Sequence, residues 1–224
     1  SLDTGFRHPA AWLWHAVEPC GRIVTFHEIV ISDTTVEDLA KMVNEYEAKM
    51  KEEYPFFEVY VRTGDPAIKQ TREHTGTSVM QEYAKHGLYI GVEGVPRDVN
   101  IGIIKVTQYL NNTIGGIQAW RYVREECPIL EKQMKNIHWA KWASKKLEYE
   151  KAPKLEIDKK DDDAPDSLRY FMTLMDDLSP EDERAPLPVD ADLIPSVMSA
   201  PTHTPASPDY VIYDGQSVLA GLEG

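Results

Sequence analysis

The opening of the chain constrains the fold most, because two β-rich runs flank a short turn. Ala10–Val17 and Arg22–Ile31 are rich in Trp, Val, Ile and Phe, and Glu18-Pro19-Cys20-Gly21 between them is typical of a turn. We therefore predict a β-hairpin, preceded by a short first strand that enters a turn at Gly5. No GxGxxG follows the first strand and no GxxxxGK[ST] occurs, so nothing predicts a nucleotide-binding fold.

Beyond the hairpin, helical and strand patterns alternate. Such alternation adds parallel strands beside the opening antiparallel ones. The sequence therefore predicts an α/β fold with a mixed sheet, antiparallel at its start and then parallel, flanked by helices. The predicted helices are Thr35–Glu53, Ser78–Lys85, Asn100–Leu110, Pro128–Ile137 and Asp166–Met175, and the predicted strands are Phe56–Val61, Leu88–Val92 and Ile117–Val123.

The character of the chain changes at about Ser179, where seven prolines begin to interrupt a stretch with little periodicity. We predict a folded domain over residues 1–178 and an irregular, Pro-rich acidic tail over residues 179–224. Tyr210-Val211-Ile212-Tyr213 is the apolar island of this tail. We expect it to pack back on the domain or to dock on a partner rather than to add a strand.

Charge and composition limit the possible functions. The net charge is −13, and residues 178–224 carry −7 of it, with eight acidic residues and one arginine. This acidity is unusual for a protein that binds phosphates, although an acidic cluster becomes less negative once it holds cations. The chain has neither a signal-peptide pattern at its start nor an apolar run near the ~20 residues of a membrane span. Cys20 and Cys127 have no zinc spacing and are expected to be reduced thiols of a cytosolic protein.

Three aspartates stand at positions where their carboxylates could converge. Asp3 lies in a first strand otherwise suited to burial, where Asp is disfavoured, although it could also cap the following turn. Asp65 comes after the strand Phe56–Val61, at the edge where ligands collect in open α/β sheets, but it could equally be a turn residue before a proline. Asp166 begins the last helix, where an N-cap is its ordinary role.

The combination of the three predicts a metal site. A first strand, a later strand end and a late helix can bring carboxylates to one sheet edge, and oxygen-only ligands suit Mg²⁺ or Mn²⁺ rather than zinc. Two such ions ~4 Å apart would activate a water and stabilise the leaving oxygen of phosphodiester cleavage. The neighbouring run Asp161-Asp162-Asp163 either shares this cation or forms a solvated acidic loop. The order of elements and acids predicts an RNase H-like nuclease.

Three short motifs follow one another along the chain: Ser1-Leu2-Asp3-Thr4-Gly5 with Pro9-Ala10-Ala11-Trp12, Gly64-Asp65-Pro66-Ala67, and Asp162-Asp163-Ala164-Pro165-Asp166-Ser167-Leu168-Arg169-Tyr170. In this order they resemble the motifs of the nuclease domain of tailed-phage large terminases. The resemblance covers about residues 1–177 and implies a Mg²⁺- or Mn²⁺-dependent endonuclease that cuts concatemeric double-stranded DNA during genome packaging. It implies that Asp3, Asp65 and Asp166 are the catalytic metal ligands and that Asp162 is a further acidic position, whereas Asp163 stands where many members have His.

The same resemblance implies partners and a location. In that family an ATPase domain drives DNA into the procapsid in the host cytoplasm, and this chain carries no Walker motif. The ATPase domain is therefore an expected partner, and the acidic tail could dock on the portal or the small terminase. Two other interpretations stay open: another RNase H-like enzyme of resolvase or transposase type, and a catalytically silent interaction module of the packaging complex.

Several further residues are weaker candidates. Arg7, beside Asp3, could touch a phosphate or be a solvated loop residue. Glu28 on the third strand could be an accessory carboxylate or an exposed strand residue. A basic stretch with two tryptophans could contact the DNA backbone or form an exposed face on which the tryptophans pack; it contains Trp139, Lys141, Trp142, Lys145 and Lys146.

Overall fold

A five-stranded mixed sheet runs through the centre of the molecule. The computed structural model describes residues 1–5, 8–72, 76–137, 161–175 and 210–211. The first three strands pair antiparallel, the fourth lies parallel to the third, and the fifth is antiparallel to the fourth. The mixed sheet is therefore confirmed. Its order is β1 (Leu2–Asp3), β2 (Ala10–Val17), β3 (Ile23–Ile31), β6 (Trp120–Val123) and β7 (Tyr210–Val211).

Isolated bridges continue the sheet on the free side of β1. Leu2 pairs in parallel with Gly64, and Thr63 pairs in parallel with Gly91. The backbone nitrogen of Leu2 donates to the oxygen of Thr63 at 2.9 Å, and that of Asp65 donates to the oxygen of Leu2 at 3.2 Å. These bonds place Asp65 beside the strand that carries Asp3.

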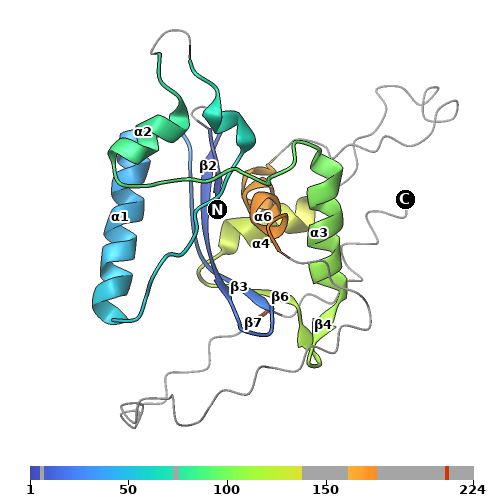
Figure 1. Ribbon diagram of the computed structural model, residues 1–224. Coiled ribbons are helices and arrows are strands. Elements are labelled where there is room, and N and C mark those ends of the chain that lie inside the picture. Colours follow the sequence, from blue (N-terminus) through green and yellow to red (C-terminus); the bar gives the residue numbers. More distant parts are fainter. Residues whose placement is uncertain (6–7, 73–75, 138–160, 176–209, 212–224) are drawn as a thin grey trace, which may run out of the picture.

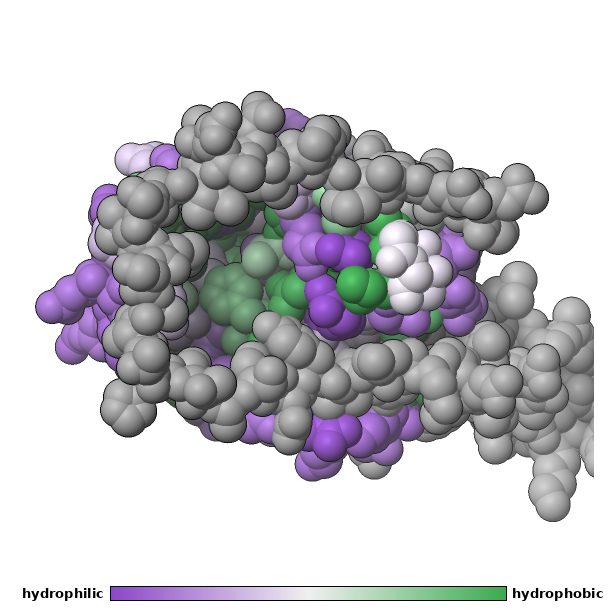
Figure 2. Space-filling model, turned by 90° about the horizontal axis from the view of Figure 1, so that it is seen from below, coloured by the Kyte–Doolittle hydropathy of each residue, from purple (hydrophilic) through white to green (hydrophobic). Residues whose placement is uncertain are grey.

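The predicted strands Phe56–Val61 and Leu88–Val92 do not form. Single bridges form instead: Gly64 pairs with Leu2 of β1, and Thr63 pairs with Gly91, so neither segment has a continuous strand neighbour. Phe56 and Tyr60 are consequently 90% and 88% exposed. A cavity of about 450 Å³ lies between this segment and β2. Seen from below, the molecule carries apolar side chains in a hollow (Figure 2).

The sheet has a helical layer on each face, as Figure 1 shows. Helices α1 (Val36–Glu53) and α2 (Val79–Lys85) cover one face, and α3 (Val99–Asn111), α4 (Pro128–Asn136) and α6 (Asp163–Met172) cover the other. Successive side chains of a strand point to opposite faces. Trp12 of β2 accordingly belongs to the core under α1 and α2, whereas Leu13 belongs to the core under α3, α4 and α6.

The helices begin and end close to their predicted limits because local capping signals set them. Thr35 caps α1 by accepting a hydrogen bond from the nitrogen of Asp38 at 3.1 Å, and Ser78 forms a capping box with Gln81 at the start of α2. The last helix begins at Asp163 instead of Asp166. Pro165 in its first turn fits this start, since those N–H groups have no helical partner in any case.

Two predictions near the end of the sheet need correction. The single strand predicted at Ile117–Val123 is divided into β5 (Ile117–Gln118), which pairs with β4 (Thr113–Ile114), and β6. Tyr210 and Val211 do add a strand, β7, against β6, because β6 offers a free edge. The rest of the predicted tail lies outside the described residues.

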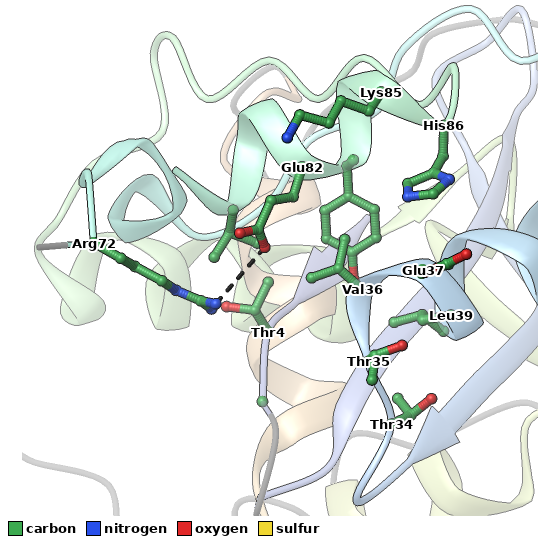
Figure 3. A pocket seen from close by; sticks show the side chains of 13 residues that line it. Thr4, Thr34, Thr35, Val36, Glu37, Leu39, Arg72, Glu82, Lys85 and His86 are labelled. Carbon is green, nitrogen blue, oxygen red and sulfur yellow. Dashed lines mark ion pairs between the residues drawn. The ribbon is translucent and has the colours of Figure 1, made fainter. Parts of the chain in front are cut away.

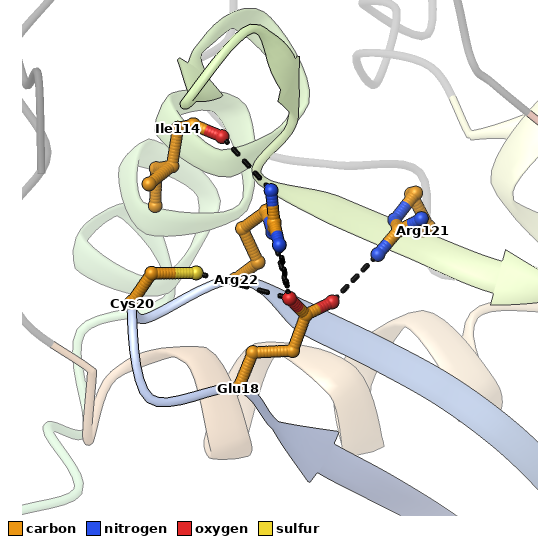
Figure 4. Close-up of polar contacts among 5 residues, drawn as sticks. All are labelled: Glu18, Cys20, Arg22, Ile114 and Arg121. Carbon is orange, nitrogen blue, oxygen red and sulfur yellow. Dashed lines mark hydrogen bonds and ion pairs between the residues drawn. The ribbon is translucent and has the colours of Figure 1, made fainter. Parts of the chain in front are cut away.

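An ion-pair cluster joins the β2–β3 turn to β6 and to the β4–β5 hairpin (Figure 4). Glu18 accepts hydrogen bonds from Nε of Arg22 at 2.8 Å and from Nη2 of Arg121 at 2.7 Å. Arg22 also donates to the carbonyl of Ile114 at 3.3 Å. The turn, the β4–β5 hairpin and β6 are therefore held together by one carboxylate and its two arginines.

None of the helices in the described parts of the chain is both long and apolar enough to cross a membrane.

Candidate active site

The first component of the site is Asp3, the last residue of β1. Leu2 before it is fully buried and pairs with Trp12, while Asp3 pairs with Ala11. β1 is held on both sides, by its pairing with β2 on one side and by the bridge from Leu2 to Gly64 on the other. This pairing therefore fixes the position of Asp3 at the end of β1.

Asp65 arrives on the neighbouring segment. It is the N-cap of a short 3-10 helix, η1 (Pro66–Lys69), and its Oδ1 accepts a hydrogen bond from the nitrogen of Ala67 at 2.8 Å. Asp65 thus does act as the turn residue that the sequence suggested. This role is compatible with a role in the site. A capping bond to one oxygen fixes the rotamer of the carboxylate and leaves the second oxygen for other partners.

Asp166 reaches the site from α6, which packs across β1. The backbone nitrogen of Asp166 donates to the oxygen of Asp162 at 2.8 Å, within the first turn of that helix. The hydroxyl of the next residue, Ser167, lies 2.9 Å from the hydroxyl of Ser1. This contact joins α6 to the chain segment that leads into Asp3.

These aspartates share one electrostatic environment around Asp3. The pKa of Asp3 is raised to about 8, first by burial and then by the negative charges of Asp166, Asp65 and Asp163. Arg169 acts in the opposite direction and lowers the same pKa. The charges of Asp65, Asp166 and Asp163 therefore all act on the carboxyl of Asp3.

The further carboxylate is Asp163, one of three neighbouring aspartates among which the sequence did not decide. Burial raises the pKa of Asp163, and its Oδ2 accepts a hydrogen bond from Nε2 of Gln133 at 3.3 Å. The predicted assisting residue Asp162 stands at the N-cap position of α6 without a side-chain capping bond. The acidic run was the sequence signal for Asp163, and the structure adds that α6 begins at this residue and that its charge acts on Asp3.

These carboxylates are the right kind of ligand for a divalent cation, but they are not arranged as a complete coordination group. Within the described ranges, no three Asp, Glu, His or Cys side chains are arranged so that they could hold a metal ion. Burial is the main cause of the raised pKa of Asp3, and the negative charges of the neighbouring carboxylates add to it. Carboxylate oxygens are the ligands that Mg²⁺ and Mn²⁺ prefer.

Glu28 is not part of this site, and neither sequence interpretation of it holds. Its carboxylate is 9% exposed and accepts hydrogen bonds from the backbone nitrogens of Ile129 at 2.6 Å and Leu130 at 2.8 Å. Both donors belong to the first turn of α4, whose N-cap residue, Cys127, makes no side-chain capping bond. Glu28 therefore supplies from β3 the acceptors that the helix start requires.

A cavity of about 570 Å³ opens directly after Asp3. Thr4 and Gly5 form one wall, and the start of α1 and residues of α2 form the others (Figure 3). Arg72 and Lys85 line this cavity, and Arg72 pairs with Glu82 at 3.7 Å. The predicted DNA-contacting residues lie outside the described residues; they are Arg7, Lys141, Lys145 and Lys146.

Comparison with known proteins gives one structural likeness. No protein-family model matches the chain, and no curated protein matches its sequence. Its fold is similar to that in the crystal structure of the g2p (large terminase) nuclease domain from the bacteriophage SPP1 with bound Mn. The TM-score is 0.51 at 18% sequence identity, and the match covers 75% of this chain and 81% of that chain. The fold is thus RNase H-like, as predicted, and at this identity the likeness establishes the fold alone.

Proposed function

We propose that this chain is a metal-dependent endonuclease domain of the phage large-terminase type, cutting concatemeric double-stranded DNA during genome packaging. The observation that supports the proposal is the half-buried carboxyl of Asp3, on which the charges of Asp65 and Asp166 act. These three acids were predicted separately from one strand, one turn and one helix, and the fold is also that of a nuclease domain solved with bound Mn.

In the proposed mechanism, Asp3, Asp65 and Asp166 would hold two Mg²⁺ or Mn²⁺ ions. Once bound, the ions would activate a water and stabilise the charge on the leaving oxygen of the phosphodiester. The carboxyl of Asp3 must release its proton before it can act as a ligand. The capping bond from Ala67 orients Asp65 in advance, and Arg169 does the same for Asp166 through a bond from Nε to Oδ1 at 3.0 Å.

The DNA lies, in this proposal, along the cavity that follows Asp3. Arg72 and Lys85 are the described cations on its wall, and positive side chains beside a cleavage site position the phosphate backbone. The domain over residues 1–178 performs the cleavage, next to an ATPase domain and in the host cytoplasm. The segment 179–224 contributes β7 to the sheet and offers its remaining residues for docking on the portal or the small terminase.

A comparison of two capping aspartates tests the proposal. Asp65 caps η1 through the nitrogen of Ala67 at 2.8 Å, and Asp98 caps α3 through the nitrogen of Asn100 at 2.9 Å. Asp65→Ala and Asp98→Ala thus remove the same kind of bond. We expect the chain to cleave plasmid DNA with Mn²⁺, Asp98→Ala to retain this activity, and Asp65→Ala to lose it while remaining folded.

The assay also separates the other interpretations. Cleavage that survives both EDTA and Asp65→Ala would refute the proposed mechanism. A strong preference for branched over linear duplex DNA would instead indicate an enzyme of resolvase or transposase type. Absence of both Mn²⁺ binding and cleavage in the unsubstituted chain would indicate a silent interaction module.

A further inference from the structure

Gly102 of α3 lies against the stem of Arg169. It is the fourth residue of a 13-residue helix, a place where glycine is destabilising relative to alanine. A Cβ atom at this position would lie 2.1 Å from Cγ and 2.6 Å from Cδ of Arg169. No side chain at position 102 fits while Arg169 keeps its place. The contact between α3 and α6 therefore requires glycine at this position for steric reasons.

Arg169 is held on several sides. Arg169 is only 5% exposed. Its Nε donates to Oδ1 of Asp166, and its guanidinium lies 4.4 Å from the ring centre of Tyr170. A buried guanidinium needs a charged partner and a fixed geometry. The bare surface of Gly102 lets the arginine reach this buried position, where one oxygen of Asp166 becomes its acceptor.

We propose that Gly102 and Arg169 are positioning residues for the metal site, because the arginine that passes over Gly102 pins one oxygen of Asp166 and leaves the other for the cation. The proposal rests on the proposed function above. Arg169 touches neither the DNA nor the metal in this arrangement. It acts through Asp166, as hydrogen-bonded partners of metal ligands generally do, and loss of such partners lowers metal affinity by roughly 10- to 100-fold.

The test measures Mn²⁺ binding directly, by electron paramagnetic resonance of the free ion, in protein shown by circular dichroism to be folded. Gly102→Ala should displace the arginine, and Arg169→Gln should remove the charged donor without steric conflict. We expect each to weaken Mn²⁺ binding by about tenfold or more and to lower kcat more than it changes KM for DNA. Gly91→Ala is the matched control, since its Cβ would meet its nearest neighbour at an ordinary 3.5 Å.

The double variant separates this role from an unrelated packing effect. If Gly102 acts only through Arg169, then Gly102→Ala adds no further loss of Mn²⁺ affinity in the Arg169→Gln background. Wild-type affinity in either folded single variant, or additive losses in the double variant, would overturn the inference. Should Gly102→Ala fail to fold, Arg169→Gln alone still decides whether the arginine matters. A parent chain that binds no Mn²⁺ contradicts the proposed function itself, whereas binding by parent and variants alike contradicts only the positioning role.

Discussion

Glu28 on β3 caps helix α4 by accepting a hydrogen bond from the backbone nitrogen of Leu130 at 2.8 Å. A second bond, from the nitrogen of Ile129, uses the other oxygen. Glu28→Ala would leave two N–H groups at a helix start without these acceptors, and we expect it to lower the free energy of unfolding by about 2–3 kcal/mol in urea denaturation. Glu28→Gln keeps one acceptor and should lose less. Equal stability of Glu28→Ala and the parent would show that the capping bonds contribute nothing.

The stability of the metal-free chain should fall as pH rises. The pKa of Asp3 is about 8 in the folded chain against an ordinary 3.8, because of burial and the charges of Asp166, Asp65 and Asp163. Between these values the folded state binds more protons than the unfolded state, so the free energy of unfolding decreases with increasing pH. In EDTA, the contribution of Asp3 is fully present below about pH 4 and is lost by about pH 8.

Thermal unfolding in EDTA measures this effect. We compare pH 5.5, roughly the middle of the range between the two pKa values, with pH 8, roughly its upper limit. The melting temperature of the parent should be lower at the higher pH, and Asp3→Asn should remove most of the difference. Addition of Mn²⁺ at pH 8 should raise the melting temperature of the parent, since a ligand that binds the folded state stabilises it. A pH dependence that is unchanged by Asp3→Asn would assign the effect to other groups.

Asp3→Asn should separate stability from activity. The substitution removes a buried charge that repels its neighbours, so we expect the metal-free protein at pH 8 to gain about 1–3 kcal/mol of unfolding free energy. The same variant should lose DNA cleavage and show no stabilisation by Mn²⁺. Asp98→Asn, at the start of α3, retains a capping side chain and serves as the control. A variant that is both more stable and fully active would remove Asp3 from the site.

The cavity after Asp3 predicts a binding effect that is independent of the chemistry. Arg72→Ala should raise KM for duplex DNA roughly threefold with little change in kcat, because a partly exposed cation contributes modestly to phosphate binding. The measurement is steady-state cleavage at two salt concentrations, and the difference from the parent should shrink at high salt. Lys41→Ala, on the exposed side of α1, removes the same charge elsewhere as a control. An effect on kcat alone would place Arg72 in the chemistry instead.

Long-range pairing explains where prediction from the sequence failed. The segment Phe56–Val61 has the composition of a strand, yet only Thr63 and Gly64 after it form bridges, to Gly91 and Leu2, so the segment itself is mostly exposed. Glu28 looks like any polar strand residue, and its role depends on a helix that begins a hundred positions later. In both cases the decisive partner is distant in the chain, and local composition carries no information about it.

The sequence by itself determined the opening hairpin, the helices with their caps and the mixed sheet, because periodicity, capping chemistry and the order of strands act locally or through simple topology. It also predicted a metal site at Asp3, Asp65 and Asp166, and this stays a prediction. Only the tertiary structure decided that the charge of Asp163 acts on Asp3 and that Arg169 passes over Gly102 to reach Asp166. These contacts depend on how α6 packs against β1 and α3. Packing at that level is set by the shapes of many side chains at once, and no short pattern in the chain records it.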